Sequence, residues 1–366
     1  MATRTAALGS AISAGEAASH WRTRAIAVVL LLAIGAYFWA MSRYPALYKK
    51  YSAGTHVTAT GAITFGTVLP VTASMPIAQR VWRTSINWLQ ANEIGMTFGF
   101  FFGAAALTVL ATLPRRRTGN AYANSLLGAA VGMPLGVCAN CVAPIGRGLY
   151  ASGMSAESTL AAMFSSPTLN VVVLAMAFAL FPLPVVGLKL ATMLAMIFVF
   201  APLVAAPMAK PAAAAAGECA IQVPGTATWA QALGTTAKTY AKSFWHVARV
   251  GLPLMLLAAV LGALAVETIP QSGLHAPATL GGILLVALAG TFLPVPMAFD
   301  VVIAYVAMTR GVALPYVVTI LCTLGIYSVY SFLVIGKTIS WKIAAAAGGA
   351  VAALGAIAGM AAMGIR

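Results

Sequence analysis

Residues 133–148 read MPLGVCANCVAPIGRG, an unusual run in an otherwise apolar chain. It places Cys138 and Cys141 three residues apart, with Asn140 between them, among two prolines and three glycines. Irregular backbone at membrane depth is tolerated only where it is buried in protein or lines a cavity. The stretch therefore predicts a broken, polar element inside a multi-spanning membrane transporter.

The rest of the chain is strongly apolar. Of its 366 residues, 61% are hydrophobic and only 7% are charged, and the mean hydropathy is +0.94. A soluble domain carries about 25% charged residues. Apolar runs of about twenty residues, which is the length that crosses a bilayer as a helix, recur along the chain. We therefore expect an all-α polytopic membrane protein with about 8–10 membrane helices or half-helices.

The charge and the cysteine content exclude several classes of protein. The net charge is +15, and in a membrane protein Lys and Arg collect in cytoplasmic loops and meet anionic lipid, so nucleic acid is not expected as a partner. Four cysteines do not make a disulfide framework. The chain has no Gly-rich phosphate-binding loop. We expect neither a cofactor nor an enzymatic activity.

Hydropathy and charge divide the chain into segments. Arg115-Arg116-Arg117 follows the second span and places that loop, and hence the N-terminus, in the cytoplasm. The expected order is a disordered cytoplasmic N-terminus (1–22), an uncleaved anchor helix (23–41), an extracytoplasmic loop with an amphipathic helix (42–92), a first permease repeat (93–206), a cytoplasmic linker (207–248), a second repeat (249–342) and a terminal membrane helix (343–366).

Residues 121–150, which contain the Cys pair, allow two topologies. They either cross the membrane once as a broken helix or form a re-entrant hairpin with the Cys motif at its tip. The hairpin places most of the Lys and Arg residues on the cytoplasmic side, so the charge distribution favours it.

The second half of the chain repeats features of the first at an offset of 158 residues. Three residues of the first half fall on identical residues of the second: Gly132, Leu135 and Gly153 on Gly290, Leu293 and Gly311. The Gly136–Pro144 break falls on Pro294-Val295-Pro296. Under the hairpin topology the copies are inverted, which is a recurrent transporter plan with discontinuous helices near the midplane.

The first half supplies the main candidate site. Cys138 and Cys141 lie on one side of a turn, where they can share a soft ion or form a disulfide, and Asn140 offers a donor and an acceptor at the same tip. A second unwound spot is expected downstream, with hydroxyls and freed carbonyls facing the cavity. Its residues are Ser165, Ser166, Pro167 and Asn170.

The second half supplies an acid and a further thiol. Asp300 is a lone carboxylate inside an apolar stretch, which by default marks a pathway or a proton relay. Cys322 aligns beside the Ser-Ser-Pro break and is a candidate third sulfur ligand for a metal held by the Cys pair. The histidines, including His246, are predicted at the surface.

Two of these motifs together resemble a known family. Residues 132–144 and 161–170 are similar to the predicted permease family that includes the ArsP-type organoarsenical effluxers, and the resemblance covers roughly residues 90–340. It implies a permease of the bacterial inner membrane, with trivalent organoarsenicals as substrates in the best understood branch. It also implies a thiol-ligand role for Cys138 and Cys141, and a second broken helix at Pro167 and Asn170.

Three functions follow as hypotheses. The first is a secondary permease that exports a soft, thiol-reactive solute, with Asp300 coupling the cycle to protons. The second is a thiol–disulfide redox protein that uses the Cys pair. The third is an auxiliary subunit that anchors a partner through its basic loop at 42–92. Membrane lipid and a small thiophilic solute are the expected partners, and the chain is compatible with a homo-oligomer or a partner subunit.

Overall fold

The computed structural model describes residues 21–45, 48, 68–72, 74–112, 119–151, 153–208, 228–268 and 277–364. These residues form helices and turns without any strand, which confirms the prediction of an all-α polytopic protein. Residues 1–20 of the predicted disordered N-terminus, most of the loop before residue 68, and the linker residues 209–227 with Cys219 lie outside the described residues, while Trp21 and Arg22 begin the first described helix.

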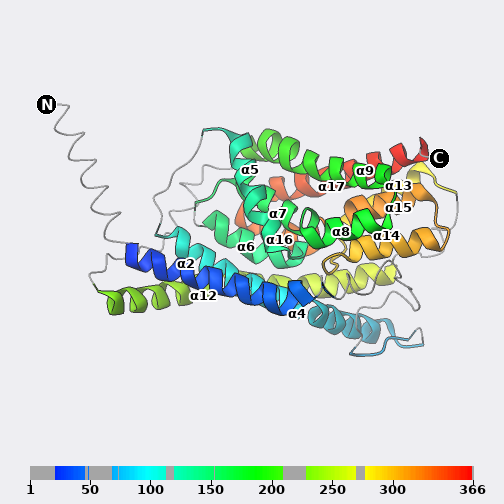
Figure 1. Cartoon of the computed structure of the whole chain (residues 1–366). Helices are drawn as coiled ribbons and strands as arrows, with labels where there is room; N and C mark the ends of the chain where they lie inside the picture. Colours follow the sequence, from blue (N-terminus) through cyan, green and yellow to red (C-terminus); the bar gives the residue numbers. More distant parts are fainter. Residues whose placement is uncertain are drawn as a thin grey trace.

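The first half consists of helices of very different lengths (Figure 1). In chain order they are α2 (Trp21–Phe38), the π-helical turn η1 (Trp39–Arg43), α4 (Ile77–Leu110), α5 (Ala121–Gly132), the 3-10 turn η2 (Met133–Leu135), α6 (Ala139–Ala151), α7 (Ala156–Thr168), α8 (Val171–Leu180), α9 (Leu183–Ala195), the π-helical turn η3 (Met196–Ala205) and α10 (Ala206–Met208).

The second half begins with the longest helix and continues with short ones. Its elements are α12 (Trp229–Thr268), α13 (Leu280–Phe292), α14 (Phe299–Thr309), α15 (Leu314–Thr323), α16 (Val329–Thr338), α17 (Trp341–Ala361) and the 3-10 turn η5 (Ala362–Gly364). In Figure 1, α2, α4 and α12 run side by side below the remaining helices.

Full spans and half-helices are both present. Among the described residues, four helical segments are long and apolar enough to cross a membrane: Trp21–Arg43, Leu183–Met208, Trp229–Leu264 and Trp341–Gly364. The pair α7 and α8, bent by 47°, adds a fifth if it crosses as one span. Helices α13 to α16 have 10–13 residues each, which at about 1.5 Å per residue is roughly half of a bilayer core. The apolar spans imply contact with membrane lipid.

Two predicted boundaries fall inside continuous helices. The expected start of the first repeat after residue 92 lies within α4, and the expected end of the linker at residue 248 lies within α12. Polar residues suggested the boundary in α4, but they do not interrupt the helix. The side chains of Ser85 and Asn92 instead bond to carbonyls four residues earlier, those of Val81 and Trp88.

The helix boundaries follow the offset seen in the sequence. Helices α7, α8 and α9 begin at residues 156, 171 and 183, and α15, α16 and α17 begin 158 residues later, at 314, 329 and 341. Gly153 and Gly311 both take positive φ angles, 96° and 80°, in the turns before α7 and α15. This common spacing supports an internal repeat.

The two halves also pack on each other reciprocally. Helix α6 contacts α16, while α14, which corresponds to α6, contacts α8, which corresponds to α16. Figure 1 shows α6 beside α16 and α8 beside α14. A twofold rotation that places each half on the other would therefore place the α6–α16 contact on the α14–α8 contact.

A glycine face on α4 positions α6. Gly95, Gly99 and Gly103 are spaced by four residues and therefore lie on one side of the helix. A Cβ on Gly95 would lie 2.5 Å from Cys141 Sγ, and one on Gly99 would collide with the Cys141 carbonyl oxygen. Small residues at this spacing allow membrane helices to approach closely. The sequence shows the spacing, but we did not single it out above.

We expect Gly99→Ala to destabilise the protein by about 1–3 kcal/mol, because the new methyl group forces α4 and α6 apart. Gly187→Ala is the matched control, since a Cβ at Gly187 in α9 meets nothing within 4 Å. The melting temperatures of both variants and of the wild type are measured by thermal unfolding in detergent. Equal melting temperatures for Gly99→Ala and the wild type would show that the close approach is not needed.

Candidate functional site

The first break separates α5 from α6. Helix α5 ends at Gly132, η2 follows, and Gly136 takes a left-handed conformation with φ of 54° before the chain becomes extended. The Cys138 carbonyl accepts the first hydrogen bond of α6, from the Val142 N–H, so Cys138 is the N-cap residue. The break thus places the Cys pair at the N-terminus of a buried helix.

Cys138 and Cys141 are buried and joined as a disulfide, with their Cα atoms 5.1 Å apart. The Cys141 N–H donates to Cys138 Sγ over 3.1 Å. Asn92 Oδ1 on α4 lies 3.6 Å from Cys138 Sγ, where it can accept a hydrogen bond from the thiol of the reduced pair. The spacing allowed the two sulfurs either to share a soft ion or to form a disulfide, and in the structure they form a disulfide.

The second break separates α13 from α14. After Phe292, Leu293 is extended and the chain has no regular secondary structure through Pro294 and Pro296; Ala298 takes a φ of 65° directly before α14. Ala298 is the only non-glycine residue with positive φ in the described part of the chain. Asp300 lies in the first turn of α14, where the partial positive charge of a helix N-terminus favours a carboxylate.

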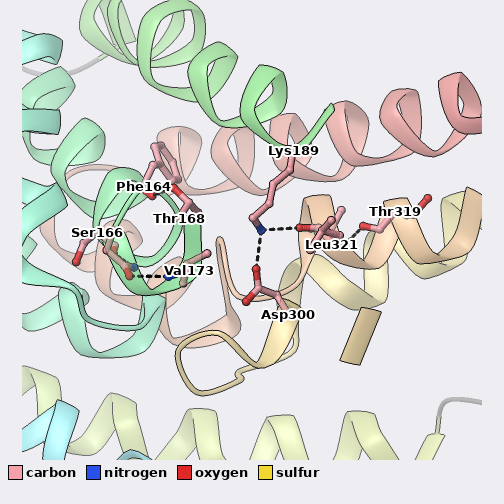
Figure 2. Close-up of polar contacts among 10 residues, drawn as sticks. Phe164, Ser166, Thr168, Val173, Lys189, Asp300, Thr319 and Leu321 are labelled. Carbon is pink, nitrogen blue, oxygen red and sulfur yellow. Dashed lines mark hydrogen bonds and ion pairs between the residues drawn. The ribbon is translucent and has the colours of Figure 1, made fainter. Parts of the chain in front are cut away.

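Asp300 pairs with a lysine that the sequence analysis missed. Lys189 of α9 lies with its Nζ 2.6 Å from Asp300 Oδ2, and both side chains are buried, with 1% and 5% exposure. The same ammonium donates to the Leu321 carbonyl over 2.9 Å. Figure 2 shows Lys189 reaching from its helix toward both oxygens. A lone lysine in an apolar helix satisfies the criterion that identified Asp300, so the signal was present.

The Leu321 carbonyl is available to Lys189 because α15 ends at Thr323, and the last carbonyls of a helix lack helical partners. Cys322 is buried beside this pair: its neighbours include Thr192, Lys189 and Asp300. It therefore belongs to the second break and not to the Cys pair. Among the described residues, no group of three His, Cys, Asp or Glu side chains is placed to hold a metal ion.

The two breaks are in contact. Asn140 Nδ2, at the start of α6, donates to the Val295 carbonyl in the second break over 3.2 Å. Ser331 Oγ of α16 donates to the Ala139 carbonyl over 2.9 Å. Asn140 is fully buried, and its Oδ1 has no hydrogen-bond partner in the described part of the chain. An unpaired buried acceptor at this junction can take a donor from a solute or a water molecule.

The Ser-Ser-Pro region does not unwind where we expected. Helix α7 continues through Pro167 to Thr168, and the break lies at Leu169 and Asn170. Asn170 caps α8 by accepting from the Val172 and Val173 N–H groups, at 3.1 Å each. Part of this region, with Ser166, Thr168 and Val173, appears at the left of Figure 2.

The serines of this region support the first break. Ser166 Oγ accepts from the Val137 N–H over 3.3 Å and lies 3.4 Å from the Val137 carbonyl. Ser165 Oγ donates to the Ala129 carbonyl over 3.2 Å. The hydroxyls thus bond to backbone groups of the broken element.

The far end of α6 is fixed by a buried arginine. Arg147 Nε donates to the His246 carbonyl over 3.3 Å, and a terminal guanidinium nitrogen lies 3.4 Å from His246 Nε2. Another nitrogen donates to Thr338 Oγ1 over 3.4 Å. His246, predicted at the surface, is therefore partly buried against Arg147, and α6 is connected to both α12 and α16.

A comparison with known families adds the decisive observation. The model of the ArsP_1 family, described as predicted permeases, matches residues 106–363. The chain belongs to the ArsP_1 family. The match includes both breaks, the Cys pair and the Lys189–Asp300 pair, and it confirms the family that the sequence motifs resemble. No curated protein and no solved structure matches the chain.

Because the ArsP_1 match begins at residue 106, α2 and most of α4 lie outside it. The η1 turn directly after α2 and the helix α4 nevertheless contact the two breaks. Trp39 Nε1 donates to the Pro134 carbonyl over 2.7 Å, and Trp88 Nε1 of α4 donates to the Pro294 carbonyl of the second break over 2.8 Å. Residues outside the match therefore complete the surroundings of the site.

We expect Lys189→Met to destabilise the protein by about 3–5 kcal/mol, because it leaves the Asp300 carboxylate buried without its cation. The double variant Lys189→Met/Asp300→Leu removes both charges and should recover much of this loss. The free energies of unfolding of the wild type, Lys189→Met, Asp300→Leu and the double variant together give the coupling energy between the two side chains. Additive effects would mean that the two side chains do not depend on each other.

Proposed function

We propose that this ArsP_1-family protein is a secondary permease of the bacterial inner membrane, with a cytoplasmic N-terminus, that exports a soft, thiol-reactive solute. A trivalent organoarsenical or a heavy-metal species has this chemistry. The observation that carries the proposal is the hydrogen bond between Asn140 and the Val295 carbonyl. It joins the break that holds the Cys pair to the break that holds the buried ion pair.

The repeat provides the mechanical part of the proposal. Equal spacing of the helices and the reciprocal contacts of α6 with α16 and α14 with α8 support two copies related by an approximate twofold axis. If the copies are inverted across the membrane, the two breaks face each other at the repeat interface. Rocking one repeat against the other then exposes the junction alternately to the two sides.

The dithiol form of the Cys pair would bind the solute. Thiolates select soft, thiophilic species, and the N-terminus of α6 favours a negative charge on the capping sulfur Cys138. When the pair is reduced, Asn92 Oδ1 can accept a hydrogen bond from the Cys138 thiol. Asn140 Oδ1 offers an acceptor to a hydroxyl or water carried by the solute. Ser165 and Ser166 have a supporting role because their hydroxyls bond to the backbone of the first break and of α5. Pro167 lies inside α7, and Asn170 donates to the Ser166 carbonyl.

The Lys189–Asp300 pair would couple the cycle to protons. A proton that reaches Asp300 neutralises the carboxylate and removes its attraction for Lys189. Lys189 still donates to Leu321, so the α9–α15 contact persists while the α9–α14 contact weakens. Protonation would thus loosen one side of the second break selectively.

We expect Cys138→Ser to abolish resistance of cells to the exported solute, because a hydroxyl does not replace a thiolate as a soft ligand. Survival of a deletion strain is measured against arsenicals, antimonials and mercury, with membrane levels of each variant checked by immunoblot. Cys219→Ser is the matched control because the sequence places Cys219 outside the site. Resistance equal to the wild type in Cys138→Ser would remove the ligand role.

The disulfide favours a second candidate function, thiol–disulfide exchange. The pair has the CxxC spacing, and Cys138 caps a helix, an arrangement that activates a thiol for attack on another disulfide.

The two functions predict different states of the pair in cells. For the permease, we expect a reduced pair that labels with maleimide, and loss of transport after oxidation to the disulfide. For exchange, Cys141→Ser should leave Cys138 in a mixed disulfide with a partner protein, visible on a non-reducing gel. A mixed disulfide together with full transport by Cys138→Ser would favour exchange.

A further inference from the structure

Helices α2 and α4 enclose a groove of about 680 Å³ on the outside of the bundle. Four aromatic side chains line it, Tyr37 and Phe38 from α2 and Phe98 and Phe101 from α4, together with Glu93 and Thr97. We call it the aromatic groove. Phe38 and Phe98 stack with their ring centroids 3.8 Å apart, which fixes two of the rings. The volume lies in the range of about 300–1,000 Å³ that small-molecule sites occupy.

Among the described residues that line the aromatic groove, Glu93 is the only charged one. It is exposed on α4 and forms no hydrogen bond or ion pair with other residues that the structure describes. It is also one of only six acidic residues in a chain with a net charge of +15. A second groove of about 530 Å³, on the α12 side of α4, shares Glu93 and Thr97 and is otherwise largely apolar.

The depth of Glu93 makes its charge informative. The preceding residue, Asn92, lies against Cys138, and Gly95 packs on Cys141, so Glu93 is level with the first break. Glu93 also lines the groove beside Met41 and Ser42, at the end of the apolar segment Trp21–Arg43. An ionisable side chain beside an apolar membrane segment by default marks a functional site with a partner, here one of opposite charge.

We propose that the aromatic groove binds a lipophilic organic cation that enters from the bilayer, with Glu93 as its counter-ion. Aromatic faces attract cations at close range, and the attraction grows when the cation is desolvated. Tyr37 and Phe101 offer exposed aromatic surface to such a cation, and Glu93 offers the opposite charge. Phe38 and Phe98 are buried and stacked on each other, with the Arg43 guanidinium over the Phe38 ring, so they supply apolar contact only. The aromatic groove lies on residues before 106, outside the family match, so this site is separate from the thiol site.

Two other occupants satisfy the groove less well. A lipid acyl chain fills the apolar walls but leaves the Glu93 carboxylate without a partner in a medium of low dielectric constant. A second copy of this chain placed on the groove by symmetry would bring two Glu93 carboxylates together, and like charges repel. Charge complementarity therefore favours the cation.

The test uses two ions of the same shape and opposite charge. The full-length protein is placed in nanodiscs of zwitterionic lipid, and binding of tetraphenylphosphonium and tetraphenylborate is measured by equilibrium dialysis against empty nanodiscs. We expect saturable binding of the cation only. Glu93→Gln should weaken it by about tenfold or more, since the charge is lost and the shape is kept.

Two variants separate the charge from the groove. Glu157→Gln is the matched control, because it removes a carboxylate from α7, where Glu157 accepts a hydrogen bond from Asn124, away from the aromatic groove. Ala33→Trp fills the groove from α2 while Glu93 stays in place. We expect cation binding to be unchanged in the first variant and lost in the second, with melting temperatures confirming that both are folded.

Three results would overturn the proposal. Equal binding of the two ions would make the groove a site for any apolar molecule. Unchanged cation affinity in Glu93→Gln or in Ala33→Trp would place the cation elsewhere. Absence of cation binding in the wild type, with a dimeric mass by light scattering, would assign the groove to contact between copies of the chain. None of these results bears on the Cys138→Ser transport assay, so the two proposals fail independently.

Discussion

In a membrane every backbone polar group must be satisfied within the protein, and this constraint governs the whole structure. Each of the two breaks interrupts a helix and frees carbonyl and amide groups that lipid cannot bind. Side chains from other helices bind several of these groups. The pairs are Trp39 with Pro134, Ser166 with Val137, Ser331 with Ala139, Trp88 with Pro294 and Asn140 with Val295. The surrounding helices are therefore placed where their side chains can form hydrogen bonds with the backbone groups that the breaks expose.

The constraint also explains how the two halves are joined. Three of these bonds cross between the halves, from Trp88 and Asn140 to the second break and from Ser331 to the first. Each half therefore supplies hydrogen bonds to the break of the other. Lys189 extends the pattern, since it binds the Leu321 carbonyl at the end of α15 and Asp300 at the start of α14. Because Lys189 contacts both the carboxylate and the end of α15, a change in the charge of Asp300 would alter the positions of the helices around the second break.

Local sequence signals predicted much of this arrangement. Proline and glycine located both breaks, because these residues act on their own backbone. The offset of 158 residues, found from few identical residues, recurs between three pairs of helix starts in the structure. Lys189 is visible in the sequence as a lone lysine in an apolar helix, but its partner is not. The partners of Lys189, Trp39 and Trp88 lie 95 to 206 residues away, which no local pattern reveals. The boundary expected at residue 92 falls inside α4, because polar residues bonded to their own helix leave no break in the backbone.

The glycine face of α4 has a consequence for motion. At Gly95, Gly99 and Gly103 the backbone of α4 lies directly against α6, with no side chain of α4 between them. A layer of side chains can change rotamers and absorb sliding, whereas two backbones in direct contact cannot. Helices α4 and α6 must therefore move as one rigid body. Any displacement of the Cys pair relative to α2 then moves Glu93 as well and reshapes the aromatic groove. A conformational change at the centre of the bundle would therefore alter a binding surface on its outside.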